Sequence, residues 1–201
     1  MKGFADVLRC LLLAAAVSLL GGCAAVYVDG NAPEVPIANY KKPASPSDVQ
    51  LIWEFQTRGV ANARATEALK ARVREQILAS GLFGSVGEAP VASGALLSAT
   101  VNNVPLSDDA ASKGFVAGLT FGIAGQTVGD GYVCTLRYTS GRSGAAVLER
   151  SGKHVIYTSI GSGSPPPGAV KMASIGEAVT TMLRQLLSRT LNDLSLEPTF
   201  P

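Results

Sequence analysis

Residues 49–81, with the sequence VQLIWEFQTRGVANARATEALKARVREQILASG, carry the pattern that decides the fold class. The first ten residues alternate well enough between apolar and polar side chains to predict a β-strand over 49–58. Its apolar face is formed by Leu51, Trp53 and Phe55. Over residues 61–80 apolar side chains recur every four residues, with charged ones mostly on the other side, which predicts an amphipathic helix. Gly81 is expected to end this helix in a left-handed conformation.

The chain after residue 81 predicts further strands and a second helix. We expect strands near 82–86, over 94–104, over 132–139 and, as one or two elements, within 145–160. Pro105 is expected to end the second of these. Apolar residues close to the helical period predict a second amphipathic helix over 169–194, after a loop over 161–168. Two helices and four to six strands predict an α+β fold, a two-layer sandwich in which both helices cover one face of a mixed or antiparallel sheet.

Composition limits the classes of function. The chain has 201 residues, 47% of them hydrophobic, and a net charge of +2. The hydrophobic fraction argues against disorder, and the small charge argues against a nucleic-acid partner. One His and three Cys cannot form a typical tetrahedral zinc site without carboxylates. We therefore expect a single domain over residues 49–201, with no metal, no cofactor and no nucleic acid.

The first 23 residues have the pattern of an export signal. Basic residues precede an apolar run over 11–20, which is too short to cross a bilayer. The residues Leu20-Gly21-Gly22-Cys23 follow and resemble the lipobox of bacterial lipoproteins. The resemblance implies a signal peptide over 1–22 and a lipidated Cys23, which anchors the protein to a membrane. In the proteobacterial pattern Ala24 implies sorting to the outer membrane, facing the periplasm. The alternatives are an ordinary secretory signal, or a retained anchor in which Cys23 is incidental.

Between the anchor and the domain, residues 24–48 contain four prolines, which predict an extended tether. As a coil such a stretch spans roughly 30 Å, so that the domain could stand off the membrane or lie against it. Cys10 leaves with the signal and Cys23 carries lipid, so that Cys134 is the one remaining thiol. Its apolar neighbours predict a buried, inert side chain.

An uncharged, glycine-spaced segment covers residues 114–129 (GFVAGLTFGIAGQTVG). Read with a period of two, it has one bulky face and one small face, which suits a buried strand packed in the core. It also fits an apolar loop that docks onto a partner subunit or a lipid interface, or a membrane-inserting hairpin repeated around an oligomeric ring. For the last two hypotheses the contact residues are Gly114, Phe115, Gly118, Leu119, Phe121 and Gly122.

The residue inventory contains no recognisable catalytic motif. His154 is the only histidine, and its apolar strand neighbours predict a structural role. Residues 161–164 (GSGS) lack the lysine of a phosphate loop. Asp108 and Asp109, with Asp130 as the only obvious third ligand, are more simply a solvated pair. The basic residues of the first helix, around Arg72, are offset by glutamates and predict a solvated surface. We therefore expect no enzymatic activity.

The order of elements resembles that of small envelope lipoproteins. A helix followed by Ser80-Gly81-Leu82-Phe83 and a strand is similar to transport-auxiliary lipoproteins and to the amino-terminal domain type of TolB and curli-secretion lipoproteins. A curli-type pore needs two membrane-crossing hairpins, whereas this chain has one glycine-rich apolar stretch. The resemblance implies a lipid-anchored, non-enzymatic binding module of an envelope complex. The alternatives are an oligomeric assembly or secretion lipoprotein that uses residues 114–129, and an unrecognised periplasmic hydrolase.

Overall fold

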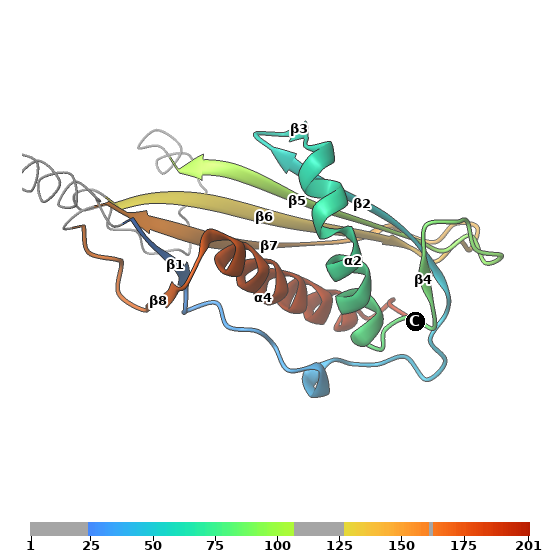
Figure 1. Ribbon diagram of the computed structural model, residues 1–201. Coiled ribbons are helices and arrows are strands. Elements are labelled where there is room, and N and C mark those ends of the chain that lie inside the picture. Colours follow the sequence, from blue (N-terminus) through green and yellow to red (C-terminus); the bar gives the residue numbers. More distant parts are fainter. Residues whose placement is uncertain (1–23, 107–126, 161–162) are drawn as a thin grey trace, which may run out of the picture.

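The computed structural model describes residues 24–106, 127–160 and 163–201, and within them the chain forms one sheet layer and one helix layer (Figure 1). Over the described residues the sheet is open and mixed and has eight strands, in the order β3-β2-β5-β6-β7-β1-β8, with β4 (Val86–Gly87) paired beside β2. Two α-helices, α2 and α4, pack on the same face of this sheet. The predicted α+β class is confirmed, and the predicted number of four to six strands is wrong.

Four long strands form the middle of the sheet: β2 (Val49–Thr57), β5 (Leu96–Leu106), β6 (Thr127–Thr139) and β7 (Leu148–Ser159). β2 is parallel to β5, and β6 is antiparallel to both of its neighbours, β5 and β7. Alternate residues of these strands face the helices, and most of the side chains at these positions are apolar and buried. The face of β2 was predicted correctly, because Leu51, Trp53 and Phe55 are all in the core.

Helix α2 (Ala63–Ala79) agrees closely with the predicted helix over 61–80. The Asn62 side chain accepts a hydrogen bond from the Ala65 N–H at 3.0 Å, which caps the first turn. The helix begins two residues later than predicted because Val60–Ala61 form the short strand β3. At the other end Gly81 has a φ of 70°, as expected for a helix terminator.

Strand β5 continues through Pro105 to Leu106, so the prediction that Pro105 ends it was wrong. The Asn103 carbonyl accepts a hydrogen bond from the Arg58 N–H on the β2 side of the strand. Pro105 lies two residues further on, and its nitrogen points to that same side, where β2 has already ended. A residue without an N–H is therefore tolerated there, as on other sheet edges.

Residues 24–48 differ from the predicted tether. β1 (Ala25–Asp29) is paired on both sides, with β7 and with β8. The chain then runs along α4 through a short 3₁₀ helix (Ile37–Asn39) and returns to the sheet at β2. Hydrogen bonds hold it there, from the Val35 N–H to Ser188 Oγ at 3.0 Å and from the Lys41 N–H to Ser195 Oγ at 3.2 Å. The prolines keep this stretch extended, but it is docked on the domain.

The second helix begins later than predicted. Residues 169–172 form the edge strand β8 (Ala169–Met172), and α4 covers Ile175–Ser195. Ser174 caps α4, because its Oγ accepts from the Glu177 N–H at 3.1 Å, while Glu177 Oε2 accepts from the Ala173 N–H at 2.6 Å. This cap separates strand from helix inside a stretch whose apolar spacing is helical throughout.

Candidate functional site

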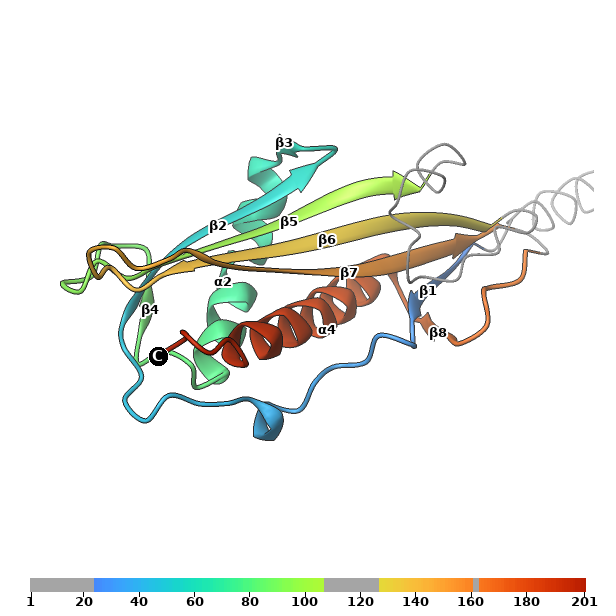
Figure 2. The same ribbon diagram turned by 180° about the vertical axis from the view of Figure 1, so that it is seen from behind.

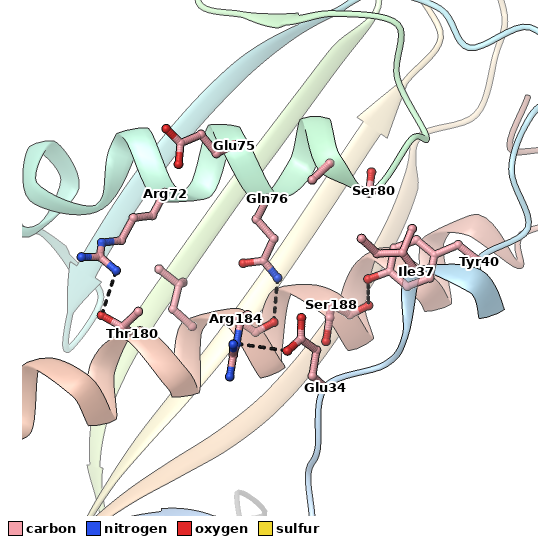
Figure 3. A pocket seen from close by; sticks show the side chains of 12 residues that line it. Glu34, Ile37, Tyr40, Arg72, Glu75, Gln76, Ser80, Thr180, Arg184 and Ser188 are labelled. Atoms are coloured by element: carbon pink, nitrogen blue, oxygen red, sulfur yellow. Dashed lines mark hydrogen bonds and ion pairs between the residues drawn. The ribbon is translucent and has the colours of Figure 1, made fainter. Parts of the chain in front are cut away.

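A groove lies between α2 and α4, where the segment after β1 crosses one end of it (Figure 3). One cavity of this groove has a volume of about 340 Å³. Three parts of the chain that are far apart in the sequence supply its walls. The lining residues are Glu34, Ile37, Tyr40, Arg72, Glu75, Gln76, Ala79, Ser80, Thr180, Leu183, Arg184 and Ser188.

A second, more open hollow of about 650 Å³ continues the groove toward the start of α4. The two hollows share Arg72 and Thr180, and the Arg72 guanidinium donates to Thr180 Oγ1 at 3.3 Å between them. Beyond this bridge the walls are Ala68 and Leu69 on α2 and residues 174–177 and 179–181 around the α4 start. The groove therefore follows both helices for several turns.

Helical spacing brings the groove residues together. Thr180, Arg184 and Ser188 are four residues apart on α4 and so share one face of the helix. From α2, Gln76 Nε2 donates to the Arg184 carbonyl at 2.7 Å. These contacts fix the two helices relative to each other while leaving the space between them open.

Tyr40 closes the end of the groove where the crossing segment lies. Its hydroxyl donates to the Ser188 carbonyl at 2.7 Å. Burial, helped by the nearby Glu34 carboxylate, raises the pKa of Tyr40 to about 12. The phenol therefore remains protonated at physiological pH and keeps this hydrogen bond, so that the wall of the cavity is preformed.

The groove combines an apolar floor with charges of both signs. Leu183 is buried in the floor, whereas Ile37 on the rim is 41% exposed. Arg184 Nε pairs with Glu34 Oε2 at 3.0 Å, and both side chains are about half exposed. Arg72 and Glu75 form no ion pair within the part of the chain that the structure describes, so both charges are available to a ligand.

The two serine hydroxyl groups of the groove are hydrogen-bonded to nearby backbone carbonyls. Ser80 Oγ donates to the Ile77 carbonyl at 2.5 Å, and Ser188 Oγ donates to the Gln185 carbonyl at 2.9 Å. Both serines are thus engaged with backbone carbonyls of their own helix rather than with a carboxylate or an imidazole. The arrangement suits binding through apolar contact, hydrogen bonds and ion pairs.

His154 and Cys134 lie in the core beneath α4. His154 is fully buried, with its Nε2 2.8 Å from Gln185 Oε1, and burial lowers its pKa, so the imidazole is neutral. This environment agrees with the structural role predicted for it. Cys134 is also fully buried, as predicted, and burial raises the pKa of its thiol to about 12. Neither side chain lines the groove.

The contact and lipidation residues predicted from the sequence lie outside the described residues. These are Cys23, Gly114, Phe115, Gly118, Leu119, Phe121 and Gly122, together with Asp108 and Asp109. Their proposed roles stay predictions. In the described ranges, no cluster of His, Cys, Asp and Glu could hold a metal ion. Over those same ranges, neither helix combines the length and the apolar character needed to cross a membrane.

Sequence reasoning missed the groove itself. Arg72 was interpreted as part of a solvated surface, and it is exposed, but it also bridges to α4. The sequence signal that could have indicated the groove is the pair of amphipathic helices. This pair predicts that both helices share a face of the sheet, but it does not say how far apart they lie. Nothing in residues 34–40 indicated that this segment would close the groove.

The comparisons with known proteins give the following results. No family model matches the chain, and no curated protein matches it either. Among solved structures it is similar to the PelC dodecamer from Paraburkholderia phytofirmans (TM-score 0.36, 13% identity, 83% of this chain and 96% of that chain). It is also similar to protein XCC0632 from Xanthomonas campestris (TM-score 0.32, 15% identity, 76% and 85% of the two chains). At these TM-scores the likeness carries no argument, so function is argued from the chain's own residues.

Proposed function

We propose that this protein is an envelope lipoprotein that binds a polypeptide segment of another envelope protein in the groove between α2 and α4. In this proposal Cys23 is acylated, the domain faces the periplasm from the outer membrane, and no chemical reaction is catalysed. The lipobox-like residues 20–23 support the anchor. The groove, with its apolar floor and with the charges of Arg72 and Glu75, which pair with no described residue, is the observation that carries the binding function.

The length of the groove favours a polypeptide as the occupant. Its α4 wall runs from Ile175 to Ser188, a rise of about 20 Å along the helix axis. Six extended residues or a helix of about thirteen residues would cover that length. An amphipathic helix laid into a groove is a common mode of peptide recognition, in which apolar side chains at helical spacing enter the floor.

The charges of Arg72 and Glu75 determine which charged side chains we expect on the partner. Arg72 lies near the middle of the groove and reaches toward Thr180, and Glu75, which also lines the groove, lies one turn further along α2 with its carboxylate directed away from α4 (Figure 3). A segment with an acidic side chain facing Arg72 and a basic one facing Glu75 would complement both. The internal pair of Arg184 and Glu34 would lie on the opposite rim.

Site-specific photo-crosslinking in intact cells tests this proposal. A photoreactive residue at Ile37, on the groove rim, is compared with one at Leu78, which lies on α2 but does not line the groove. The two side chains are matched in exposure, at 41% and 43%. We expect one dominant adduct from position 37 and a much weaker one from position 78. Equal adducts from both positions would contradict the groove as the binding site.

A substitution that fills the groove with a larger side chain provides a second test. Ala79 is exposed in the groove, and Ala71 is exposed on the same helix outside it. Ala79→Trp should abolish the adduct formed from position 37 by occupying the floor, whereas Ala71→Trp should leave it unchanged. An adduct that survives Ala79→Trp in a folded protein would place the partner elsewhere.

The same experiment tests the alternative of self-association. An adduct with twice the mass of the chain would identify a second copy as the occupant, and the mass of the purified protein in detergent would then give the size of the assembly. PelC from Paraburkholderia phytofirmans forms a dodecamer.

The anchor is tested by Cys23→Ala, which should release the protein from the membrane fraction.

A further inference from the structure

The position of β1 determines how far the domain can stand from its anchor. β1 begins at Ala25, and its residues are paired with β7 and β8. Val28 is 1% exposed, so this strand cannot leave the sheet without opening the core. Cys23 precedes Ala25 by two residues, which span at most about 7 Å. A lipid on Cys23 would therefore hold the start of β1 close to the membrane.

Other strands begin or end beside the start of β1. Ala25 pairs with Ser159, the last residue of β7, and Ser159 in turn pairs with Thr127, the first residue of β6. Figure 2 shows that α4 starts at this end, next to β8, and runs along the sheet toward the C-terminus. We call this the β1 end of the sheet.

Four of the exposed large apolar side chains lie at the β1 end. Val128 and Ile160 lie at the start of β6 and just after β7, Val170 lies on the edge strand β8, and Ile175 is the first residue of α4. Each of the four side chains is about half exposed. Partly exposed aliphatic side chains at one end of a domain suit the boundary between lipid headgroups and acyl chains.

The polar groups of this end are compatible with a lipid surface. Lys171, on β8, is exposed and forms no ion pair within the described ranges, so its ammonium can meet a lipid phosphate. The exposed Glu177 is held by the Ala173 N–H at 2.6 Å at the cap of α4. The Asp29 side chain is buried and accepts hydrogen bonds from Asn31.

We infer that the β1 end of the sheet rests directly on the lipid bilayer, with α4 leading away from the membrane. The inference rests on the acylation of Cys23 in the proposed function. A fixed orientation then takes the place of the extended tether expected from the sequence. The binding groove would then open to the side and extend from the membrane surface outward into the periplasm.

A pair of labelling sites at the two ends of α4 tests this orientation. Ile175 and Leu196 are both 55% exposed, and the 21 residues of the helix between them span about 32 Å. Ile175→Cys and Leu196→Cys would be made in the mature acylated protein and labelled with a fluorophore. Cys134 is fully buried with a pKa of about 12, so that it does not compete for the label.

The labelled proteins would be reconstituted in vesicles of phosphatidylethanolamine and phosphatidylglycerol that carry a headgroup-linked quencher. We expect the label at position 175 to be quenched several-fold more strongly than the label at position 196. Equal quenching, or stronger quenching at position 196, would overturn the orientation.

The mass of the mature N-terminal peptide separates this proposal from the proposed function, which requires the acylation of Cys23. A peptide without acyl mass would overturn both, whereas an acylated peptide with equal quenching would overturn the orientation alone.

Discussion

His154 should make the stability of the protein depend on pH. Burial is the largest cause of its lowered pKa, with the positive charge of Arg189 adding to it, while Gln185, the Val155 backbone and Asp29 act in the opposite direction. The unfolded chain, with a histidine pKa of about 6.5, therefore binds a proton at a higher pH than the folded chain does. We predict that the free energy of unfolding decreases as the pH falls below about 6.5, by at most about 1.4 kcal/mol per pH unit.

Urea denaturation at several pH values between 7 and 5 measures this effect. His154 is the only histidine of the chain, so the comparison with His154→Gln isolates it. The variant should show a flatter profile, because an amide does not titrate. A profile as steep as that of the unmodified protein would assign the pH dependence to other groups.

Gly152 lies where β7 passes beneath α4, and we predict that any side chain there destabilises the fold. A Cβ atom at this position would lie 2.7 Å from Thr190 Oγ1 and 3.1 Å from Leu186 Cδ1. Overpacking of this kind typically costs about 1–3 kcal/mol, so Gly152→Val should lower the free energy of unfolding by that amount. Gly87→Ala is the control, since a Cβ at Gly87 would meet no atom within 4 Å. Equal stability of both variants would contradict this packing argument.

Among the secondary-structure elements, those with a long periodic pattern could be predicted from the sequence. β2 and α2 are examples, because each has one apolar face over many residues. β1 and β8 could not, because each is very short and adjoins a stronger pattern. β1 precedes a proline-rich stretch, and in β8 the spacing of Met172 to Ile175 continues the helical period of α4. The Ser174 and Glu177 cap was the local signal that separates β8 from α4.

The cap of α4 should contribute measurably to stability. Replacing Ser174 by Ala removes the acceptor for the Glu177 N–H, and we predict a loss of about 1 kcal/mol in the free energy of unfolding. Ser174→Asp should retain most of the stability, because aspartate is an equally good capping residue and also suits the positive end of the helix dipole. Denaturant unfolding of both variants checks this. An Asp variant as unstable as the Ala variant would contradict the role of the hydrogen bond.

β1 should behave as part of the fold rather than as a linker. Val28 is 1% exposed, and its partner on the edge strand, Val170, is 50% exposed. We predict that Val28→Ala lowers the free energy of unfolding by roughly 1–3 kcal/mol and that Val170→Ala changes it by less than about 0.5 kcal/mol. A negligible effect of Val28→Ala in the same unfolding experiment would restore the tether interpretation of residues 24–48.

At the scale of the whole molecule, the groove could not be predicted, because its walls come from three distant segments. Tyr40, Arg72 and Arg184 are brought together only after both helices have packed on the sheet. The apolar faces of the helices determine that they pack there, whereas the spacing between them depends on which strands lie beneath. α2 lies over β2, and α4 lies over β6, β7 and β1, so the width of the sheet sets the width of the groove.

The short connection between anchor and sheet gives the last prediction. A flexible Gly/Ser linker of about 20 residues, inserted between Cys23 and Ala24, would allow the domain to move roughly 25 Å from the membrane. Membrane binding should persist, because the acyl chains supply it. The quenching of a label at Ile175→Cys should fall toward that of one at Leu196→Cys, since the connection would no longer hold the β1 end on the lipid. The same linker inserted at residue 143, in the β6–β7 connection, should leave the quenching unchanged. Undiminished quenching with the linker at Cys23 would instead show that Val128, Ile160, Val170 and Ile175 hold the domain on the bilayer by themselves.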